Sequence, residues 1–529
     1  MTTGIVPLPA SAEYRPDDTP FRLAGDTKLV ASGDGAAAIA ELLADRLRGG
    51  TGYDLPVVDG MEGGASDIVL VVRGASAGES TTDPAADAYT LETGADGARI
   101  EADAASGLFR GTQSLLQLLP PDASGRTPAP ADGFAAVAAS VDDRPRFAYR
   151  GASLDVARHF MPVDDVLSYI DAIAFLKFNV LHLHLTDDQG WRIRIDAWPQ
   201  LTDLGGQTAV WHDEGGYYTK DDYRRIVEYA AARSVTVVPE IDLPGHTNAA
   251  LSSVPELNCD GVATEPYHGI EVGFSSLCAS PERAEVTDRF LADVLGEVAA
   301  MTPGPWLHVG GDESHATSPE DYVNLVDRIT ATGAATGKTV IGWHEIGASR
   351  NLPPGTIGQY WGFVGATDDA EGAPGDEAAA AAETLADTRS FVEQGGRVIF
   401  SPADVAYLDM KYVEDPQNAL GQDIGLQWAK GPTTLEEAYG WEPADIVPGV
   451  GEADILGVEA PIWTETLRTM DDVEFMAFPR ITGIAEIAWS PRVEGGRDEE
   501  AFVERVAGLA PYWDAAGVEF YRIRGIDWR

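Results

Sequence analysis

The chain has 529 residues, of which 44% are hydrophobic and 23% charged, and its formal net charge is -48 with a pI near 4.3. This length predicts two domains, and the composition is that of an ordinary globular protein. The negative charge excludes nucleic acid or an anionic membrane as the main partner, because phosphate groups would be repelled.

The N-terminal sequence MTTGIVPLPASAEYR has no basic region followed by an apolar run, so it does not look like a secretory leader. Nowhere does the chain approach the roughly 18 apolar residues of a membrane-spanning helix. We expect a cytoplasmic protein without a membrane partner; the alternative is a secreted protein whose leader has been removed. Only six of the 37 basic residues are lysine, which fits either salt adaptation or a coding bias.

Residues 1–142 alternate short strand-like runs with alanine-rich helical runs, the pattern of a small α+β domain. The strand-like runs include 67–72, 88–93 and 97–102, and the helical runs cover 36–50 and 107–120. The segment 120–133 is rich in proline, glycine and alanine, which predicts a loop or linker before the next domain.

Residues 143–529 show apolar strand-like runs separated by amphipathic helical runs, the pattern of repeated βα units around a parallel sheet. Helical runs cover 163–178, 219–234 and 282–301. The candidate strands are 149–157, 179–187, 235–243, 306–313, 339–346, 356–362, 397–403 and 455–463. Eight units favour a closed (β/α)8 TIM barrel with a C-terminal helix over an open sheet, and no glycine-rich phosphate motif follows the first strand.

Polar residues gather where the candidate strands end. In a (β/α)8 barrel all these ends open on one face, which carries the chemistry. We therefore expect one site built from Arg158, His159, Asp187, Asp188, Asp242, His246, Asp312, Glu313, Trp343, His344, Glu345, Trp361, Tyr407, Asp409, Trp463 and Glu465.

His182 and His184 alternate with leucines and so point to the same side of a strand. They fit either a zinc site or hydrogen-bonded core groups, and the second is the more common state of inward-facing histidines. No HExxH motif, cysteine cluster or GxSxG elbow accompanies them. We expect no metal and no other cofactor.

The chain has two cysteines, Cys259 and Cys278, which lie around a predicted loop. They fit either a disulfide or two reduced, buried thiols. The sequence leaves both readings open.

Paired carboxylates near many tryptophans suit a sugar substrate. Glycosidic cleavage needs an acid for the leaving oxygen and a nucleophile or base at the anomeric carbon. Indoles offer flat apolar surfaces to the C–H faces of a pyranose ring. Five of the twelve tryptophans lie near candidate strand ends: Trp343, Trp361, Trp428, Trp463 and Trp489. Of these, Trp489 sits in the helix-like run GIAEIAWS and is better interpreted as core.

Several long segments together resemble the β-N-acetylhexosaminidases of glycoside hydrolase family 20. In chain order, the segments are HLHLTDDQGWRIRI at the second strand, GGYYTKDDYRRIVEYAAARSVTVVPEIDLPGH leading into the third, HVGGDES at the fourth, and WTE at the end of the eighth. The resemblance covers nearly the whole chain, because the first 140 residues look like the small α+β domain that precedes the barrel in this family.

The resemblance implies substrate-assisted catalysis, in which the 2-acetamido oxygen of the substrate attacks the anomeric carbon. Glu313 would be the general acid and then the base. Asp312 would hydrogen-bond the acetamide N–H, and Tyr407 would donate to the acetamide oxygen. Asp187 and His246 would form a relay with Glu313. Asp242 fits either this network or a loop cap.

The resemblance also implies a set of sugar-binding residues. Arg158 would bind the 3- and 4-hydroxyls, while Asp409 and Glu465 would bind the 4- and 6-hydroxyls. The indoles of Trp343, Trp361 and Trp463 would enclose the acetamide methyl, and Trp428 would line the outer site.

Asp312 and Glu313 are adjacent, and in a regular strand their side chains would point to opposite faces. Gly310 and Gly311 allow the backbone to leave the regular pleat, so a bend there is predicted to aim both acids into one pocket. A neighbouring negative charge and partial burial favour the protonated form that an acid needs.

The sequence thus predicts an exo-acting, retaining enzyme that removes terminal β-linked N-acetylglucosamine, with N-acetylgalactosamine as a second candidate. Its partners would be oligosaccharides or glycoconjugates that end in an N-acetylhexosamine. The alternatives are a family member that releases a disaccharide and an inactive barrel that binds N-acetyl sugars.

Overall fold

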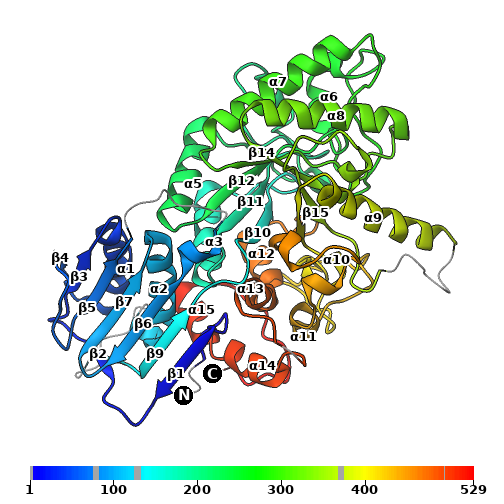
Figure 1. Cartoon of the computed structure of the whole chain (residues 1–529). Helices are drawn as coiled ribbons and strands as arrows, with labels where there is room; N and C mark the ends of the chain where they lie inside the picture. Colours follow the sequence, from blue (N-terminus) through cyan, green and yellow to red (C-terminus); the bar gives the residue numbers. More distant parts are fainter. Residues whose placement is uncertain (1–3, 75–82, 124–132, 367–374, 494, 529) are drawn as a thin grey trace.

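The computed structural model describes residues 4–74, 83–123, 133–366, 375–493 and 495–528, and in it a sheet domain precedes a closed barrel (Figure 1). Most of the predicted linker, 124–132, lies outside the described residues. Among the described residues, no helix is both long and apolar enough to cross a membrane.

The N-terminal domain is a seven-stranded sheet in the order β1-β9-β6-β7-β5-β3-β4, with a separate pair formed by β2 and β8. Helices α1 (Ala36–Thr51) and α2 (Ala105–Leu118) pack against this sheet, as the alanine-rich runs predicted. The strands are β1 (Ser11–Arg15), β2 (Phe21–Leu23), β3 (Leu29–Ser32), β4 (Val57–Asp59), β5 (Ile68–Val72), β6 (Tyr89–Gly94), β7 (Gly97–Ala102), β8 (Phe134–Ala136) and β9 (Ala138–Asp143).

The eight remaining strands close into a parallel barrel, which confirms the predicted fold. Each candidate strand forms in its expected place: β10 (Tyr149–Asp155), β11 (Val180–His184), β12 (Thr236–Glu240), β13 (Trp306–His308), β14 (Thr339–Trp343), β15 (Ile357–Tyr360), β16 (Arg397–Phe400) and β17 (Ile455–Ala460). The barrel is a packed core rather than a pore. Side chains of the strands, and Ala148 just before β10, fill part of its interior: Tyr149, Val180, Val238, Trp306, Ile341, Ile357, Ile399 and Leu456.

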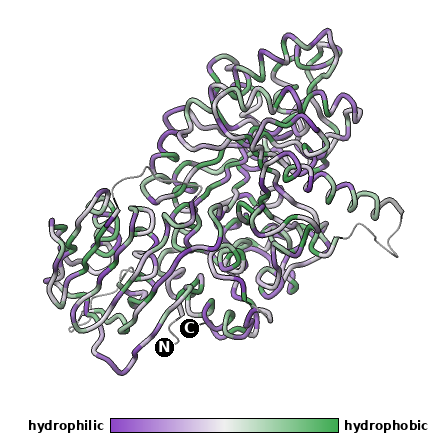
Figure 2. Tube along the Cα trace, in the orientation of Figure 1, coloured by the Kyte–Doolittle hydropathy of each residue, from purple (hydrophilic) through white to green (hydrophobic). Residues whose placement is uncertain are grey.

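Helices surround this barrel, and their hydrophilic residues lie mostly on the outer side (Figure 2). They are α3 (Val163–Phe175), α4 (Gln200–Asp203), α5 (Lys220–Ala232), α6 (Asn248–Ser253), α7 (Ala284–Met301), α8 (Pro319–Ala335), α9 (Gly375–Glu393), α10 (Ala403–Ala406), α11 (Leu435–Tyr439), α12 (Met470–Ala477) and α13 (Ile481–Trp489). The chain ends with α14 (Glu499–Ala507) and α15 (Ala510–Ala516).

Helix α5 illustrates why these segments become helices. Thr219 and Asp222 form a reciprocal capping box at its start, which satisfies backbone N–H groups that have no partner within the helix. Tyr223, Ile226 and Ala230 recur three and four residues apart and are buried on one face. The other face keeps its charged residues in solvent.

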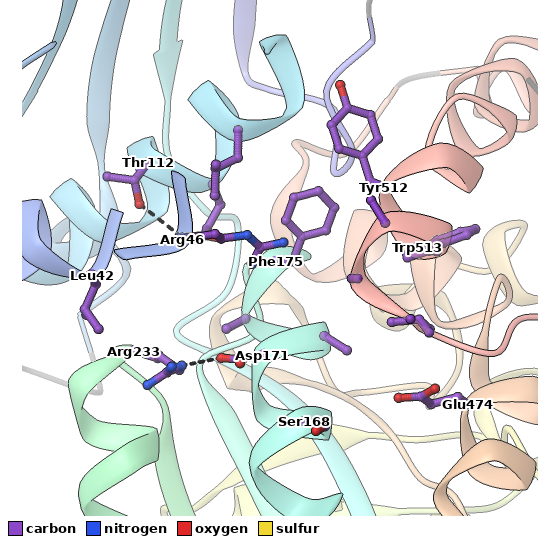
Figure 3. A pocket seen from close by; sticks show the side chains of 18 of the residues that line it. Leu42, Arg46, Thr112, Ser168, Asp171, Phe175, Arg233, Glu474, Tyr512 and Trp513 are labelled. Carbon is purple, nitrogen blue, oxygen red and sulfur yellow. Dashed lines mark hydrogen bonds and ion pairs between the residues drawn. The ribbon is translucent and has the colours of Figure 1, made fainter. Parts of the chain in front are cut away.

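A cavity of about 640 Å³ lies where α1 and α2 meet the barrel helix α3 and the C-terminal helix α15 (Figure 3). The Arg46 guanidinium lies over the Phe175 ring, 5.4 Å from its centroid, and Arg233 pairs with Asp171. None of the predicted site residues is among the described residues that line this cavity. It is therefore a feature of the domain junction.

Cys259 and Cys278 form a disulfide, so the first of the two readings left open by the sequence holds. The bridge closes a loop between α6 and α7. This loop reaches the mouth of the barrel, because Gln189 donates a hydrogen bond to the Gly269 carbonyl at 2.9 Å.

Candidate active site

The turn after β13 brings the two adjacent acids together. Gly310 and Gly311 have φ values of 68° and 116°, and Glu313 has a φ of 46°. A Cβ on Gly310 would collide with the carboxylate of Asp242, so only glycine fits. The chain thereby leaves the pleat, and both acids approach Nε2 of one imidazole. His246 Nε2 lies 3.6 Å from Asp312 Oδ2 and 3.4 Å from Glu313 Oε2.

His246 also contacts the acid that ends the second strand. Its Nδ1 lies 3.1 Å from Asp187 Oδ1, so the imidazole stands between Asp187 and Glu313. Burial disfavours charge on both partners. The charges of Arg158 and His246 nevertheless hold the pKa of Asp187 well below its ordinary range, and Asp187 in turn raises the pKa of His246 well above its own.

The surroundings of Asp312 favour its protonated form. Burial, together with the charges of Glu313 and Glu240, raises its pKa from 3.8 to about 6, although His246 opposes the rise. Asp312 is thus mostly ionised at neutral pH and gains a proton in mild acid. Asp242 lies beside it, has a pKa raised well above its ordinary value by burial and by the charge of Asp312, and accepts a hydrogen bond from Gly311 N–H at 3.1 Å.

Aromatic rings form a continuous wall beside these acids. The ring of Tyr407, which follows α10, lies 5.8 Å from that of Trp428 and 6.0 Å from that of Trp463. Trp463 in turn lies 5.9 Å from Trp343, and Trp361 lies 6.0 Å from Trp428. Trp343 is fully buried, whereas 48% of Trp428 is exposed, which puts Trp428 at the rim.

Of the predicted hydroxyl-binding residues, Arg158 and Asp409 are buried and Glu465 is partly buried, and one polar atom of each has no hydrogen-bond partner among the described residues. These atoms are Asp409 Oδ2, Glu465 Oε2 and Arg158 Nε. Arg158 is not free to swing, because its Nη2 lies 2.8 Å from Asp187 Oδ2 and its guanidinium lies over the Trp463 ring. Buried polar groups are normally hydrogen-bonded, so three unpaired atoms on charged groups that interact with one another indicate a polar ligand.

The structure gives Glu345 a partner within the site and adds a further residue, Tyr322. Both oxygens of Glu345 accept from Trp361 Nε1 at 3.1 Å, and burial and the charge of Asp312 raise the Glu345 pKa well above its ordinary value. Tyr322 in α8 donates to the Gly311 carbonyl at 2.5 Å and so supports the turn. The place of Glu345 at a strand end predicted that it belongs to the site, whereas no sequence pattern pointed to Tyr322.

His182 and His184 are hydrogen-bonded core groups, the reading that the sequence favoured. His182 Nδ1 lies 2.8 Å from Glu459, and His184 Nε2 lies 2.9 Å from Asp187. Trp489 is likewise core, since it is fully buried in α13 and donates to Asp143 at 2.9 Å.

Comparison with known proteins agrees with this geometry. The model described as "Glycosyl hydrolase family 20, catalytic domain" matches residues 147–492, and that of domain 2 of the same family matches residues 2–133. A β-N-acetylhexosaminidase of Cellulomonas fimi is 39% identical over 99% of this chain and 97% of its own length.

Two solved structures resemble the chain over almost its full length. The GH20 β-N-acetylhexosaminidase of Streptomyces coelicolor A3(2) is 43% identical with a TM-score of 0.87, covering 99% of this chain and 98% of that one. A mutant β-hexosaminidase of Streptomyces plicatus in complex with its product GlcNAc is 44% identical with a TM-score of 0.87, covering 99% and 97%.

Proposed function

This chain belongs to glycosyl hydrolase family 20 and is a glycoside hydrolase of the β-N-acetylhexosaminidase type, and from that premise we propose how it works. It removes a terminal, non-reducing β-linked N-acetylglucosamine with retention, and the nucleophile is the acetamide oxygen of the substrate itself. One observation carries this proposal. Asp312 Oδ1 is buried beside Glu313 and accepts no hydrogen bond from an N–H group or an alcohol hydroxyl of the described residues, and the acetamide N–H supplies one.

In the first step the acetamide oxygen attacks the anomeric carbon, the glycosidic C–O bond breaks, and the leaving oxygen takes the proton of Glu313. The product is a cyclic oxazolinium ion. In the second step Glu313 takes a proton from water, the water oxygen attacks the same carbon, and the ring opens to restore the acetamide. Two inversions at one carbon give net retention.

Asp312 and Tyr407 act on the two ends of the acetamide. An ionised Asp312 accepts from the N–H and stabilises the positive charge that develops on the amide. Burial and the charges of Asp312 and Asp409 raise the pKa of Tyr407 well above its ordinary value, so its hydroxyl stays protonated and donates to the acetamide oxygen. The indoles around them exclude water from the forming ring.

The imidazole of His246 supports the acid. Its Nδ1 faces the ionised Asp187, and its Nε2 faces Glu313. A positive charge on this ring stabilises the Glu313 carboxylate after the proton has left. His246 thereby makes proton donation easier.

Three groups are suited to hold the sugar hydroxyls. The unpaired oxygens of Asp409 and Glu465 are acceptors, and Arg158 Nε is a donor. Because a hydroxyl both donates and accepts, it satisfies either kind of group. A pocket enclosed in this way takes one terminal residue and makes the enzyme exo-acting. Oligosaccharides or glycoconjugates that end in an N-acetylhexosamine are the substrates.

The proposal is tested by the rates of hydrolysis of an aryl β-N-acetylglucosaminide and the matching aryl β-glucoside, which lacks the acetamide. We expect turnover of the first and a loss of several orders of magnitude with the second. Similar rates would contradict the role of the acetamide. Binding of N-acetylglucosamine without hydrolysis of either would favour an inactive sugar-binding barrel.

We also propose that the protein works in an oxidising compartment, which favours the secreted alternative over a cytoplasmic location. The support is the disulfide between Cys259 and Cys278, because disulfides persist mainly outside the reducing cytosol. Fractionation of the native host with a thiol-alkylating reagent tests this. Reduced thiols in a cytosolic fraction would contradict it.

A further inference from the structure

At the base of the candidate site, one carboxylate contacts both the aromatic wall and the histidines beside the catalytic acids. Glu240, the last residue of β12, is fully buried inside the barrel. Its Oε1 accepts from Trp343 Nε1 at 2.9 Å and lies 3.0 Å from His308 Nδ1. Its Oε2 contacts His184 Nδ1 and lies 3.1 Å from His182 Nε2. The mechanism described above leaves this carboxylate without a role.

From Glu240 an alternating series of carboxylates and imidazoles runs to the catalytic acid. His184 bridges Glu240 and Asp187, with Nε2 at 2.9 Å from Asp187 Oδ2. Asp187 then contacts His246 through its other oxygen at 3.1 Å, and His246 Nε2 lies 3.4 Å from Glu313. The four residues of this series that precede Glu313 are all buried, so no water competes for their contacts. They are Glu240, His184, Asp187 and His246.

Each ring nitrogen of His184 faces a carboxylate oxygen, so both nitrogens must carry a proton to make favourable contacts. Burial opposes this charge. The charge of Glu240 and the hydrogen bonds to Glu240 and Asp187 outweigh burial and raise the pKa of His184 to about 9. Glu240 itself is held ionised, since His308, His184 and His182 bring its pKa well below the ordinary value despite burial.

We propose that Glu240 is a positioning residue for catalysis: it holds His184, which orients Asp187 and thereby the ring of His246 toward Glu313, and it holds the indole of Trp343 in the aromatic wall. This inference rests on the proposed function, because it assigns Glu240 an effect on that acid. Groups that orient the ligands of a metal site typically change activity about 10- to 100-fold, and we expect an effect of that size from Glu240.

The test uses two aryl N-acetylglucosaminides, one with a poor and one with an activated leaving group. Glu240→Gln keeps the size of the side chain but removes its charge and one acceptor. We expect kcat/KM to fall about 10- to 100-fold on the poor leaving group, and several times less on the activated one, because acid assistance then matters less. His184→Gln should change this ratio in the same direction.

Tyr149→Phe is the matched control. Its hydroxyl donates to Glu459, which is linked to Glu240 through His182, so the variant leaves the contacts of Glu240 and His184 themselves in place. The variant loses a buried hydrogen bond of the same barrel core. It should lower the melting temperature while the ratio of the two rates stays at the wild-type value.

A purely structural role for Glu240 predicts equal losses on both substrates, in proportion to the unfolded fraction, and that result would overturn the inference. So would unchanged kinetics in folded Glu240→Gln. If neither variant folds, neutron crystallography of the wild-type protein decides, with hydrogen expected on both ring nitrogens of His184. A neutral His184 ring would overturn the inference.

Failure of the inference is distinguishable from failure of the proposed function. Glu313→Gln should itself lose far more activity on the poor leaving group than on the activated one. If it does so while Glu240→Gln does not, only the positioning role is wrong. If Glu313→Gln affects both substrates alike, the assignment of the acid is wrong.

Discussion

Replacing Asp312 with asparagine should make the protein more stable while it removes most of the activity. In the folded protein the carboxylate is only 13% exposed and faces Glu313, and its pKa rises from 3.8 to about 6. The folded state therefore holds a proton on Asp312 more tightly than the unfolded chain does. Above pH 6 the ionised group destabilises the fold, and this penalty disappears as the pH falls toward 4.

The size of the effect follows from the two pKa values. A difference from 3.8 to about 6 corresponds to about 3 kcal/mol at neutral pH. Asparagine has the same shape and keeps one acceptor oxygen, but it loses the attraction to His246. We therefore expect Asp312→Asn to raise the free energy of unfolding by about 1 to 3 kcal/mol at pH 7.5.

Urea denaturation at pH 7.5 and pH 4.5 measures this difference, and Asp187→Asn is the matched control. Arg158 and His246 lower the pKa of Asp187 despite its burial, so its ionised form stabilises the fold above the ordinary pKa. Its replacement should destabilise the protein at pH 7.5. The reasoning is refuted if Asp312→Asn is no more stable than wild type at pH 7.5, or if its advantage persists undiminished at pH 4.5.

Three further predictions concern activity and the outer loop. The pH profile of kcat/KM should fall on its acid side with an apparent pKa near 6, because Asp312 must be ionised; a profile flat down to pH 4.5 would contradict this. Tyr407→Phe should lower kcat by about 10² to 10³ on an aryl N-acetylglucosaminide, since it removes a donor to the developing charge, and a loss under threefold would exclude that role. Replacing both Cys259 and Cys278 with serine should lower stability by about 2 to 4 kcal/mol, measured by urea denaturation; unchanged stability would show that the loop needs no bridge.

Local patterns were sufficient for the barrel and for much of the site. Alternating apolar runs located all eight strands, and the strand ends then placed Asp187, Asp312 and Glu313 on one face. The two glycines before Asp312 predicted the bend, because glycine is the residue that most readily adopts the positive φ values found there.

Contacts between distant strands left no such signal. Glu240 looks like one acid in an apolar strand, and only the closed barrel brings it to Trp343, 103 positions away. Arg158 was expected to face the sugar, yet packing also ties it to Asp187. The raised pKa of Asp312 likewise depends on burial and on charges from other strands, which the order of residues does not express.

The most direct test of the account is a crystal structure with a thiazoline mimic of the cyclised acetamide. The account predicts Asp312 within hydrogen-bond distance of the ring nitrogen, Tyr407 beside the atom that replaces the acetamide oxygen, and Glu313 facing the side of the leaving group. A complex in which Asp312 or Glu313 points away from the bound ligand would contradict it.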